Sequence, residues 1–278
     1  MQIDLVQQAK ELWHDEFGDS PSFIERFFDL YCDDESFFFV AENGVLKSML
    51  FILEYRLKIK GRDYKGAYLY AFCTNKAFRK QGMGSALLVS TERRLRELEF
   101  DFIFLISRND LLIPYYNKLS FSSCFSHNMK EWAGNRNKSE KLSNYSIKSS
   151  DYFDKDLYLR FASCRDNAVM HSAKDLLLYG NGGYKFYYLE NSDEVLAIAI
   201  VRTSEDEIII LDIVSACKEK ETMLFDLIFT NENKKLLVPS KIKSRECDKN
   251  SQLYMIKSLR DNVEVLPKEL YFNLLLDK

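Results

Sequence analysis

A short loop with two glycines, Arg79-Lys80-Gln81-Gly82-Met83-Gly84, is the segment of this sequence best suited to chemistry. Gly82 and Gly84 carry no side chain, so successive backbone N–H groups can approach an anion closely. The sequence predicts a strand before the loop and a helix after it, and a helix N-terminus attracts negative charge. Arg79 and Lys80 add mobile positive charge at the rim. Such a loop suits a ligand with two linked phosphates.

The same glycines have a purely structural interpretation. Gly82 could end a turn, and Gly84 could let a helix pack closely on a sheet. Two other phosphate-binding motifs do not fit. A Walker A loop needs G-x-x-x-x-G-K-S/T, and a dinucleotide fingerprint needs three glycines near the first strand. Neither pattern is present at this loop.

Histidine and cysteine residues form no recognisable site in the sequence. The six cysteines lie far apart without a CxxC pair, which predicts free thiols in a reducing cytoplasm and no metal site. His14, His127 and His171 have no partner at a spacing typical of a catalytic triad. Cys73 lies in an apolar run, where burial raises the pKa of a thiol, so we expect no covalent mechanism there.

The overall composition indicates a globular protein of two domains. The chain has 278 residues, of which 46% are hydrophobic and 29% charged. Its formal charge of −3 shows no basic excess, so we expect neither nucleic acid nor an anionic membrane as a partner. No apolar run reaches about eighteen residues, and the first residues do not resemble a signal peptide. These features favour a cytoplasmic location.

The first half of the sequence predicts an α/β domain. Two amphipathic helices come first, and the second begins at Ser20-Pro21, an N-cap followed by proline. Strands with hairpin turns follow, and Asn43-Gly44 is a strong turn signal. The later predicted elements are a strand over 67–74, a helix over 84–98, a strand over 100–106 and a helical segment over 110–119.

The second half predicts a similar order of elements. Residues 134–150 are rich in Asn, Ser and Lys, so we place a first domain at 1–133, a linker at 134–146 and a second domain at 147–278. The predicted elements are a helical region over 151–178, strands over 184–189, 195–202 and 207–214, a helix over 219–229, and strands near Leu236 and over 270–275. This order is consistent with a divergent internal repeat.

With these motifs the chain resembles the GNAT acetyltransferase superfamily. The family signature R/Q-x-x-G-x-G/A is matched by Arg79, Gly82 and Gly84. A second family segment, N-x-x-A-x-x-x-Y-x-x-x-G-F, is matched by Asn109, Tyr116 and Phe121, with Leu112 and Ser120 in place of alanine and glycine. The pair Tyr115-Tyr116 and the opening helices look like a bacterial subgroup with two such domains in tandem. The resemblance covers residues 1–125 and is faint over 145–278.

The resemblance implies a fold and a set of site residues. Each domain would be a mixed, mostly antiparallel, splayed sheet flanked by helices. Tyr116 would be the general acid for the departing thiolate, or Tyr115 if the helix is offset by one residue; either tyrosine could instead be a packing residue. Glu54 is a tentative base, with a solvated carboxylate as the alternative. The residues expected to bind acetyl-CoA are Phe72, Cys73, Thr74, Arg79, Lys80, Gln81, Gly82, Met83, Gly84, Ser85 and Asn109.

The implied activity is N-acetyl transfer from acetyl-CoA to a primary amine, by direct attack in a ternary complex. The acceptor would be a small-molecule amine or a lysine side chain. In the second half, residues 215–221 contain no glycine and two glutamates, so we expect that half to bind no CoA and to complete the acceptor pocket. The alternative is a non-catalytic protein that binds or senses acyl-CoA on the same fold. The sequence predicts no oligomeric state.

Overall fold

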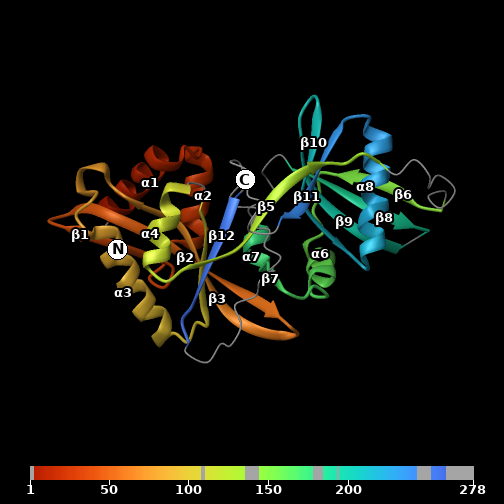
Figure 1. Ribbon diagram of the computed structural model, residues 1–278. Helices are drawn as coiled ribbons and strands as arrows, with labels where there is room; N and C mark the ends of the chain where they lie inside the picture. Colours follow the sequence, from red (N-terminus) through yellow and green to blue (C-terminus); the bar gives the residue numbers. More distant parts are fainter. Residues whose placement is uncertain are drawn as a thin grey trace. The chain divides into compact units, whose positions relative to one another are not determined.

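The computed structural model describes residues 3–107, 110–134, 144–177, 184–192, 194–242 and 252–260. The chain divides into two units, whose elements are labelled in Figure 1. Unit 1 consists of Met1–Leu57, Arg62–Ser123 and Tyr254–Pro267. Unit 2 consists of Lys58–Gly61, Cys124–Leu253 and Lys268–Lys278. Each unit contains both strands and helices and is described by itself.

Unit 1 contains the strand order β1-β2-β3-β4-β12. Its helices are α1 (Ile3–Phe17), α2 (Pro21–Tyr31), α3 (Met83–Glu97) and α4 (Ile113–Lys118), with short 3-10 turns η1 (Lys76–Phe78) and η2 (Asp110–Leu112). Its strands are β1 (Phe37–Glu42), β2 (Val45–Ile59), β3 (Arg62–Thr74), β4 (Phe102–Ser107) and, from Tyr254 onward, β12 (Gln252–Ser258).

The local signals in the first half of the sequence are confirmed. Ser20 caps α2 by accepting a hydrogen bond from the Phe23 N–H, and Pro21 is the first helical residue. Asn43 and Gly44 both have positive φ, 52° and 76°, which is the conformation that a type I′ turn requires between β1 and β2. These turns fix the register of the strands that precede the glycine loop.

Aromatic side chains form the core between α1, α2 and the sheet of unit 1. Trp13 of α1 is 1% exposed, and its ring lies 4.7 Å from that of Phe27 and 5.4 Å from that of Tyr70 on β3. The Trp13 indole N–H donates to the Asp19 carboxylate at 2.7 Å, so its one polar group is paired. Burial of these large rings fixes the carboxyl-terminal end of α1 against β3.

Strand β12 completes unit 1 although it comes from the far end of the sequence. It lies next to β4, and Tyr254, Met255 and Ile256 are buried. Lys257 bridges both oxygens of Glu92 on α3, at 2.8 and 2.6 Å. The Leu259 N–H donates to the Asp101 carbonyl at 2.8 Å. These contacts fix the strand to elements that precede it by most of the chain.

Unit 2 contains the strand order β5-β11-β10-β9-β8-β6, and α8 connects β10 to β11 (Figure 1). Two buried apolar clusters form its core, and one of them lies between the sheet and α8. Its strands are β5 (Ser122–Glu131), β6 (Ser146–Ser150), β7 (Ala168–Met170), β8 (Lys185–Asn191), β9 (Glu194–Thr203), β10 (Glu207–Ser215) and β11 (Lys235–Ile242). Its helices are α6 (Lys155–Ala162), α7 (Ala173–Leu176) and α8 (Lys218–Glu232).

The division into units differs from the sequence-based boundaries in two places. Strand β5 falls within the predicted first domain, but it pairs with β11 and its residues from Cys124 onward belong to unit 2. Strand β12 falls within the predicted second domain, but it belongs to unit 1. Pairing between strands far apart in sequence leaves no local signal. The hydrophobic periodicity of the sequence therefore did not predict that β5 belongs mainly to unit 2 and β12 to unit 1.

The prediction of one helical region over 151–178 was wrong. The structure has the short helices α6 and α7 there, with strand β7 between them. The buried run Ala168-Val169-Met170 fits either a helix or a strand by its apolar character alone. The predicted strand over 270–275 and the Gly180–Gly183 turn lie outside the described residues. Within the described ranges, no helix is both long and apolar enough to span a membrane.

Candidate functional site

Strands β3 and β4 run parallel but pair over only part of their length. The pairs are Gly66 with Phe102, Ala67 with Ile103 and Tyr68 with Phe104. Strand β3 then continues to Thr74 and β4 to Ser107, and these described ends have no register partners in each other. The ladder between the two strands therefore ends at Tyr68 and Phe104, and a ligand between the strands could pair with backbone groups beyond it, such as those of Phe72.

The backbone beyond Ala71 determines which residues face this opening. Ala71 has a φ of +47°, a left-handed conformation that interrupts the pleat of β3. The Cys73 carbonyl accepts from the Ser48 hydroxyl of β2 at 2.9 Å, and the Asn75 N–H donates to the Lys47 carbonyl of β2 at 2.9 Å. Backbone groups alternate in direction along a strand, so those of Phe72 and Thr74 face away from β2, toward the opening.

The glycine loop ends at a helix terminus with unpaired amides. Gly82 is the N-cap of α3 and has a φ of +80°. The Ala86 N–H makes the first intrahelical bond, to the Gly82 carbonyl at 2.9 Å. The N–H groups of Met83, Gly84 and Ser85 precede this bond and have no partner within the helix. No acidic residue lies in the first turn of α3, so nothing there opposes an anion.

The side chains of the loop are more ordered than the sequence indicates. Arg79 donates through Nε to the Thr74 carbonyl at 3.0 Å and through Nη2 to the Glu16 carboxylate of α1. Gln81 donates back to the Ala77 carbonyl at 3.1 Å. Lys80 is exposed. Arg79 is therefore a fixed cation rather than the mobile one that we predicted from its position at the rim.

Gly84 packs against the end of β3. A Cβ atom at this position would lie 3.0 Å from Thr74 Oγ1 and 3.2 Å from Cζ of the Phe72 ring. The close-packing interpretation therefore holds for Gly84. It does not compete with the phosphate interpretation, because close packing is what brings the α3 terminus next to the open end of β3.

The two adjacent tyrosines of α4 have different surroundings. Tyr116 is buried, its ring lies 5.7 Å from that of Phe121, and burial raises its pKa well above the ordinary value. Tyr115 is half-buried, and its hydroxyl lies 3.2 Å from Ser85 Oγ in the first turn of α3. The Tyr116 hydroxyl therefore stays protonated at neutral pH. Tyr115 lies next to the first turn of α3.

Ser120 occupies a position where glycine is conformationally favoured. Its φ is +66°, and the Phe121 N–H donates to the Tyr116 carbonyl at 3.1 Å, which closes the end of α4. A serine in the left-handed region costs on the order of 1 kcal/mol. The departure from glycine in the sequence motif therefore adds strain but does not displace Tyr116 or the start of β5.

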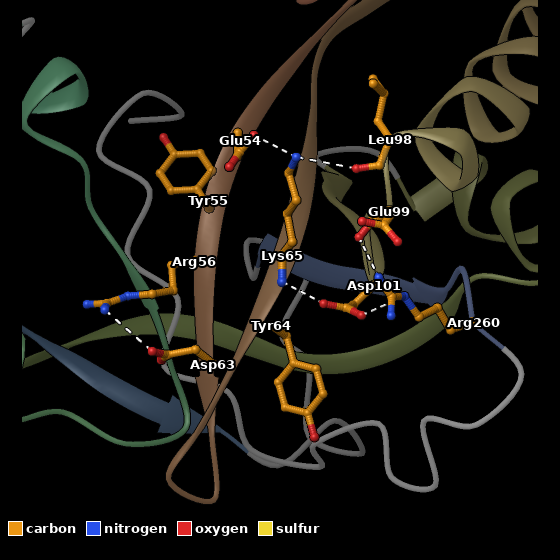
Figure 2. Close-up of a pocket in the computed structure, with 10 residues that line it drawn as sticks. All are labelled: Glu54, Tyr55, Arg56, Asp63, Tyr64, Lys65, Leu98, Glu99, Asp101 and Arg260. Atoms are coloured by element: carbon orange, nitrogen blue, oxygen red, sulfur yellow. Dashed lines mark hydrogen bonds and ion pairs between the residues drawn. The ribbon is translucent and has the colours of Figure 1, made fainter.

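Glu54 lies apart from these groups. Figure 2 shows it on the wall of a different, open pocket of about 490 Å³, together with Lys65, Asp101 and Arg260. Its carboxylate is mostly exposed and pairs with Lys65 Nζ at 3.2 Å. Glu54 is thus an ion-paired, mostly exposed strand carboxylate, and its role as the base stays a prediction.

Asn109 and Cys73 are the other predicted site residues. Asn109 lies outside the described residues. Cys73 is buried, its backbone carbonyl faces β2, and burial raises the pKa of its thiol. Glu16, Ser48 and the left-handed Ala71 belong to the site but were missed, since nothing in their local sequence distinguishes them. No cluster of His, Cys, Asp or Glu within the described ranges could hold a metal ion.

Unit 2 repeats the same strand arrangement. Strands β10 and β11 are parallel and pair only at Glu207, Ile208 and Ile209, and β10 then continues to Ser215. The register of β10 is interrupted just after Ile210, as Ala71 interrupts β3. Ile213 lies four residues beyond the last pair, the same position that Phe72 has after Tyr68.

In unit 2 the groups at this position are occupied by the protein's own side chains. The Ile213 N–H donates to Asp212 Oδ1 at 2.8 Å, and its carbonyl accepts from Arg165. Arg165 also bridges both Asp212 oxygens, at 2.9 and 3.3 Å. Burial alone would raise the pKa of Asp212, but the Arg165 guanidinium holds it well below the usual range. At the start of α8, burial raises the pKa of Glu221, which accepts from Ser215 Oγ at 3.2 Å.

Comparison with known proteins identifies the fold of both units. Residues 1–124 match the model of the acetyltransferase (GNAT) domain family. This family generally uses acetyl-CoA. Comparison with curated proteins gave no match.

Solved structures extend the similarity over nearly the whole chain. A probable N-acyltransferase from Enterococcus faecalis has a TM-score of 0.74 at 11% identity, over 93% of this chain and 71% of its own. A GCN5-related N-acetyltransferase from Anabaena variabilis has a TM-score of 0.74 at 14% identity, over 94% and 71%. A tandem GNAT protein from the clavulanic acid biosynthesis pathway has 0.53 at 10%, over 94% and 97%. The chain thus has two GNAT-like units in tandem.

Proposed function

We propose that unit 1 transfers an acetyl group from acetyl-CoA to a primary amine. The observation that carries the proposal is the combination of the open β3–β4 edge with the unpaired amides of Met83, Gly84 and Ser85. An open strand edge suits the amides of a pantetheine arm, which can pair like an added strand. The helix terminus suits its pyrophosphate. One continuous site therefore fits both halves of the same ligand.

The chemistry needs little from the protein beyond positioning. The neutral amine attacks the thioester carbon, the C–S bond breaks, and the ammonium proton passes to water. The Phe72 N–H, which faces the opening, is placed to polarise the thioester carbonyl. Tyr116 donates a proton to the departing thiolate and regains one from water. A thiol has a pKa near 8.5 and the buried tyrosine a higher one, so this acid assists modestly.

We assign no base among the side chains that the structure describes. Glu54 is mostly exposed and pairs with Lys65, so we propose that the amine loses its proton to water or arrives neutral. The rate should therefore rise with pH as the acceptor amine deprotonates. We propose a small-molecule amine or a lysine side chain as the acceptor class.

The test is acetyl-CoA-dependent release of free thiol in the presence of a panel of primary amines, combined with calorimetric titration of acetyl-CoA. We expect turnover with at least one amine and one binding site per chain, because unit 2 fills the equivalent position with Asp212 and Arg165. Binding without turnover across the panel would favour the alternative, a sensor of acyl-CoA. Absence of binding would contradict both.

Matched tyrosine variants separate the two candidate acids. Tyr116→Phe should lower kcat about 10- to 100-fold with little change in the KM for acetyl-CoA, which is at or below the usual range of about 10²–10⁴-fold because a thiolate leaves without much help. Tyr115→Phe should leave kcat unchanged, because its hydroxyl contacts Ser85 at the phosphate end. Steady-state kinetics at saturating amine measure both constants. The reverse result would identify Tyr115 as the acid, and no effect of either would leave both as packing residues.

A further inference from the structure

We propose that Glu16 is a positioning residue, which acts through Arg79 to hold the phosphate loop ready for acyl-CoA; this rests on the proposed function. Glu16 lies in the last turn of α1 and accepts from Arg79 Nη2. Its side chain is only 15% exposed, whereas that of Arg79 is 45% exposed. Lys76 Nζ lies 3.9 Å from the other carboxylate oxygen.

Glu16 is itself held in a fixed position. Trp13, one turn earlier in α1, is buried against Tyr70 of β3 and donates to Asp19. Helix α1 can therefore neither slide nor rotate relative to β3 without breaking the aromatic core. The carboxylate of Glu16 is a rigid acceptor next to the loop.

Arg79 links this acceptor to the end of β3. Its Nε donates to the Thr74 carbonyl at 3.0 Å, which closes residues 74–79 into a defined turn. A guanidinium has five N–H donors, and these two contacts use two of them. The remaining donors are on the partly exposed guanidinium, where a phosphate oxygen can accept them in bidentate geometry.

The negative charge of Glu16 lies close to the proposed anion site, so the direction in which acyl-CoA affinity changes on its removal tests its role. A carboxylate near an anion site repels the anion, so removal of Glu16 should strengthen acyl-CoA binding if charge alone matters. If Glu16 orients Arg79, its removal should weaken binding instead, because Arg79 then loses its preorganised geometry. The two possibilities predict opposite changes in affinity.

The experiment compares two acetyl donors in Glu16→Ala and Glu16→Gln variants of the full chain. Acetyl-CoA contains the pyrophosphate, whereas S-acetyl-pantetheine lacks it. We expect kcat/KM for acetyl-CoA to fall about tenfold in Glu16→Ala, chiefly through KM, and less in Glu16→Gln, which retains an acceptor. The value for S-acetyl-pantetheine should not change. Glu11→Ala, which removes the same charge from an exposed site on the same helix, should leave both donors unaffected.

A second variant and a binding measurement complete the test. In an Arg79→Gln background, Glu16→Ala should cause no further loss, since the two residues act together. An equal loss with both donors, or tighter binding of acetyl-CoA, would overturn the inference. Calorimetric titration of CoA keeps the test valid for a protein that binds without turnover. If wild-type protein binds no CoA, the proposed function itself fails, which is a distinct outcome.

Discussion

A Met255→Asp variant is expected to unfold unit 1, although residue 255 follows nearly all of unit 2 in the sequence. Met255 is fully buried in β12, next to β4, so the new carboxylate would be buried without a designed partner. The cost of burying an unpaired charge is about 3–5 kcal/mol. At a typical dependence on urea, this lowers the unfolding midpoint by on the order of 1–5 M.

The two tryptophans of the chain allow each unit to be followed separately. Trp13 is buried in unit 1, and Trp132 lies in unit 2, where its indole N–H donates to Asp226 at 2.9 Å. In a Trp132→Phe background, urea unfolding followed by fluorescence reports on unit 1 alone. Met255→Leu is the matched control, since a volume-conserving change costs less than about 1.5 kcal/mol. An unchanged Trp13 transition in Met255→Asp would show that β12 does not support unit 1.

A Gly82→Ala variant is expected to lose at least tenfold in affinity for acetyl-CoA. Gly82 has a φ of +80° at the start of α3, and its missing Cβ would meet no atom within 4 Å. The only obstacle to alanine is therefore the left-handed backbone, which costs about 1–2 kcal/mol. The loop can relieve this strain by turning away from the left-handed region, and the amides of Met83 and Gly84 then lose their common direction.

Gly44 provides a matched control for this prediction. It has a φ of +76° and also has open space around it, but it lies in the β1–β2 turn. Gly44→Ala therefore introduces the same strain away from the loop. Both variants should lose similar stability in urea, and only Gly82→Ala should lose affinity in a calorimetric titration. Equal affinities would show that the conformation of Gly82 does not matter for the ligand.

The sequence alone predicted the parts of this molecule that depend on local chemistry. The Ser20 cap, the Asn43-Gly44 turn and the helix after Gly82 each have a residue whose side chain or backbone freedom determines the structure. The glycine loop was singled out for the same reason, and phosphate binding there stays a prediction. The boundaries of α3, predicted at 84–98 and observed at Met83–Glu97, differ by one residue.

The parts that were missed depend on contacts between distant residues. Nothing around Glu16 indicates that it pairs with Arg79, and nothing around Ser48 indicates that its hydroxyl donates to the Cys73 carbonyl. The ion pair between Glu54 and Lys65 likewise has no local signal. The assignment of β5 and β12 to units was missed for the same reason. Hydrophobic periodicity indicates whether a segment is a helix or a strand, but not which strand it pairs with.

The position of β12 also has a consequence for how the chain is made. Synthesis proceeds at about 5–20 residues per second, so the roughly 150 residues between β4 and β12 take on the order of 8–30 s to emerge from a ribosome. During that interval β4 has an unpaired edge, which is a template for aggregation with other nascent chains. Unit 1 can therefore complete its sheet only after translation of unit 2, and its yield in cells should depend on chaperones that shield this edge.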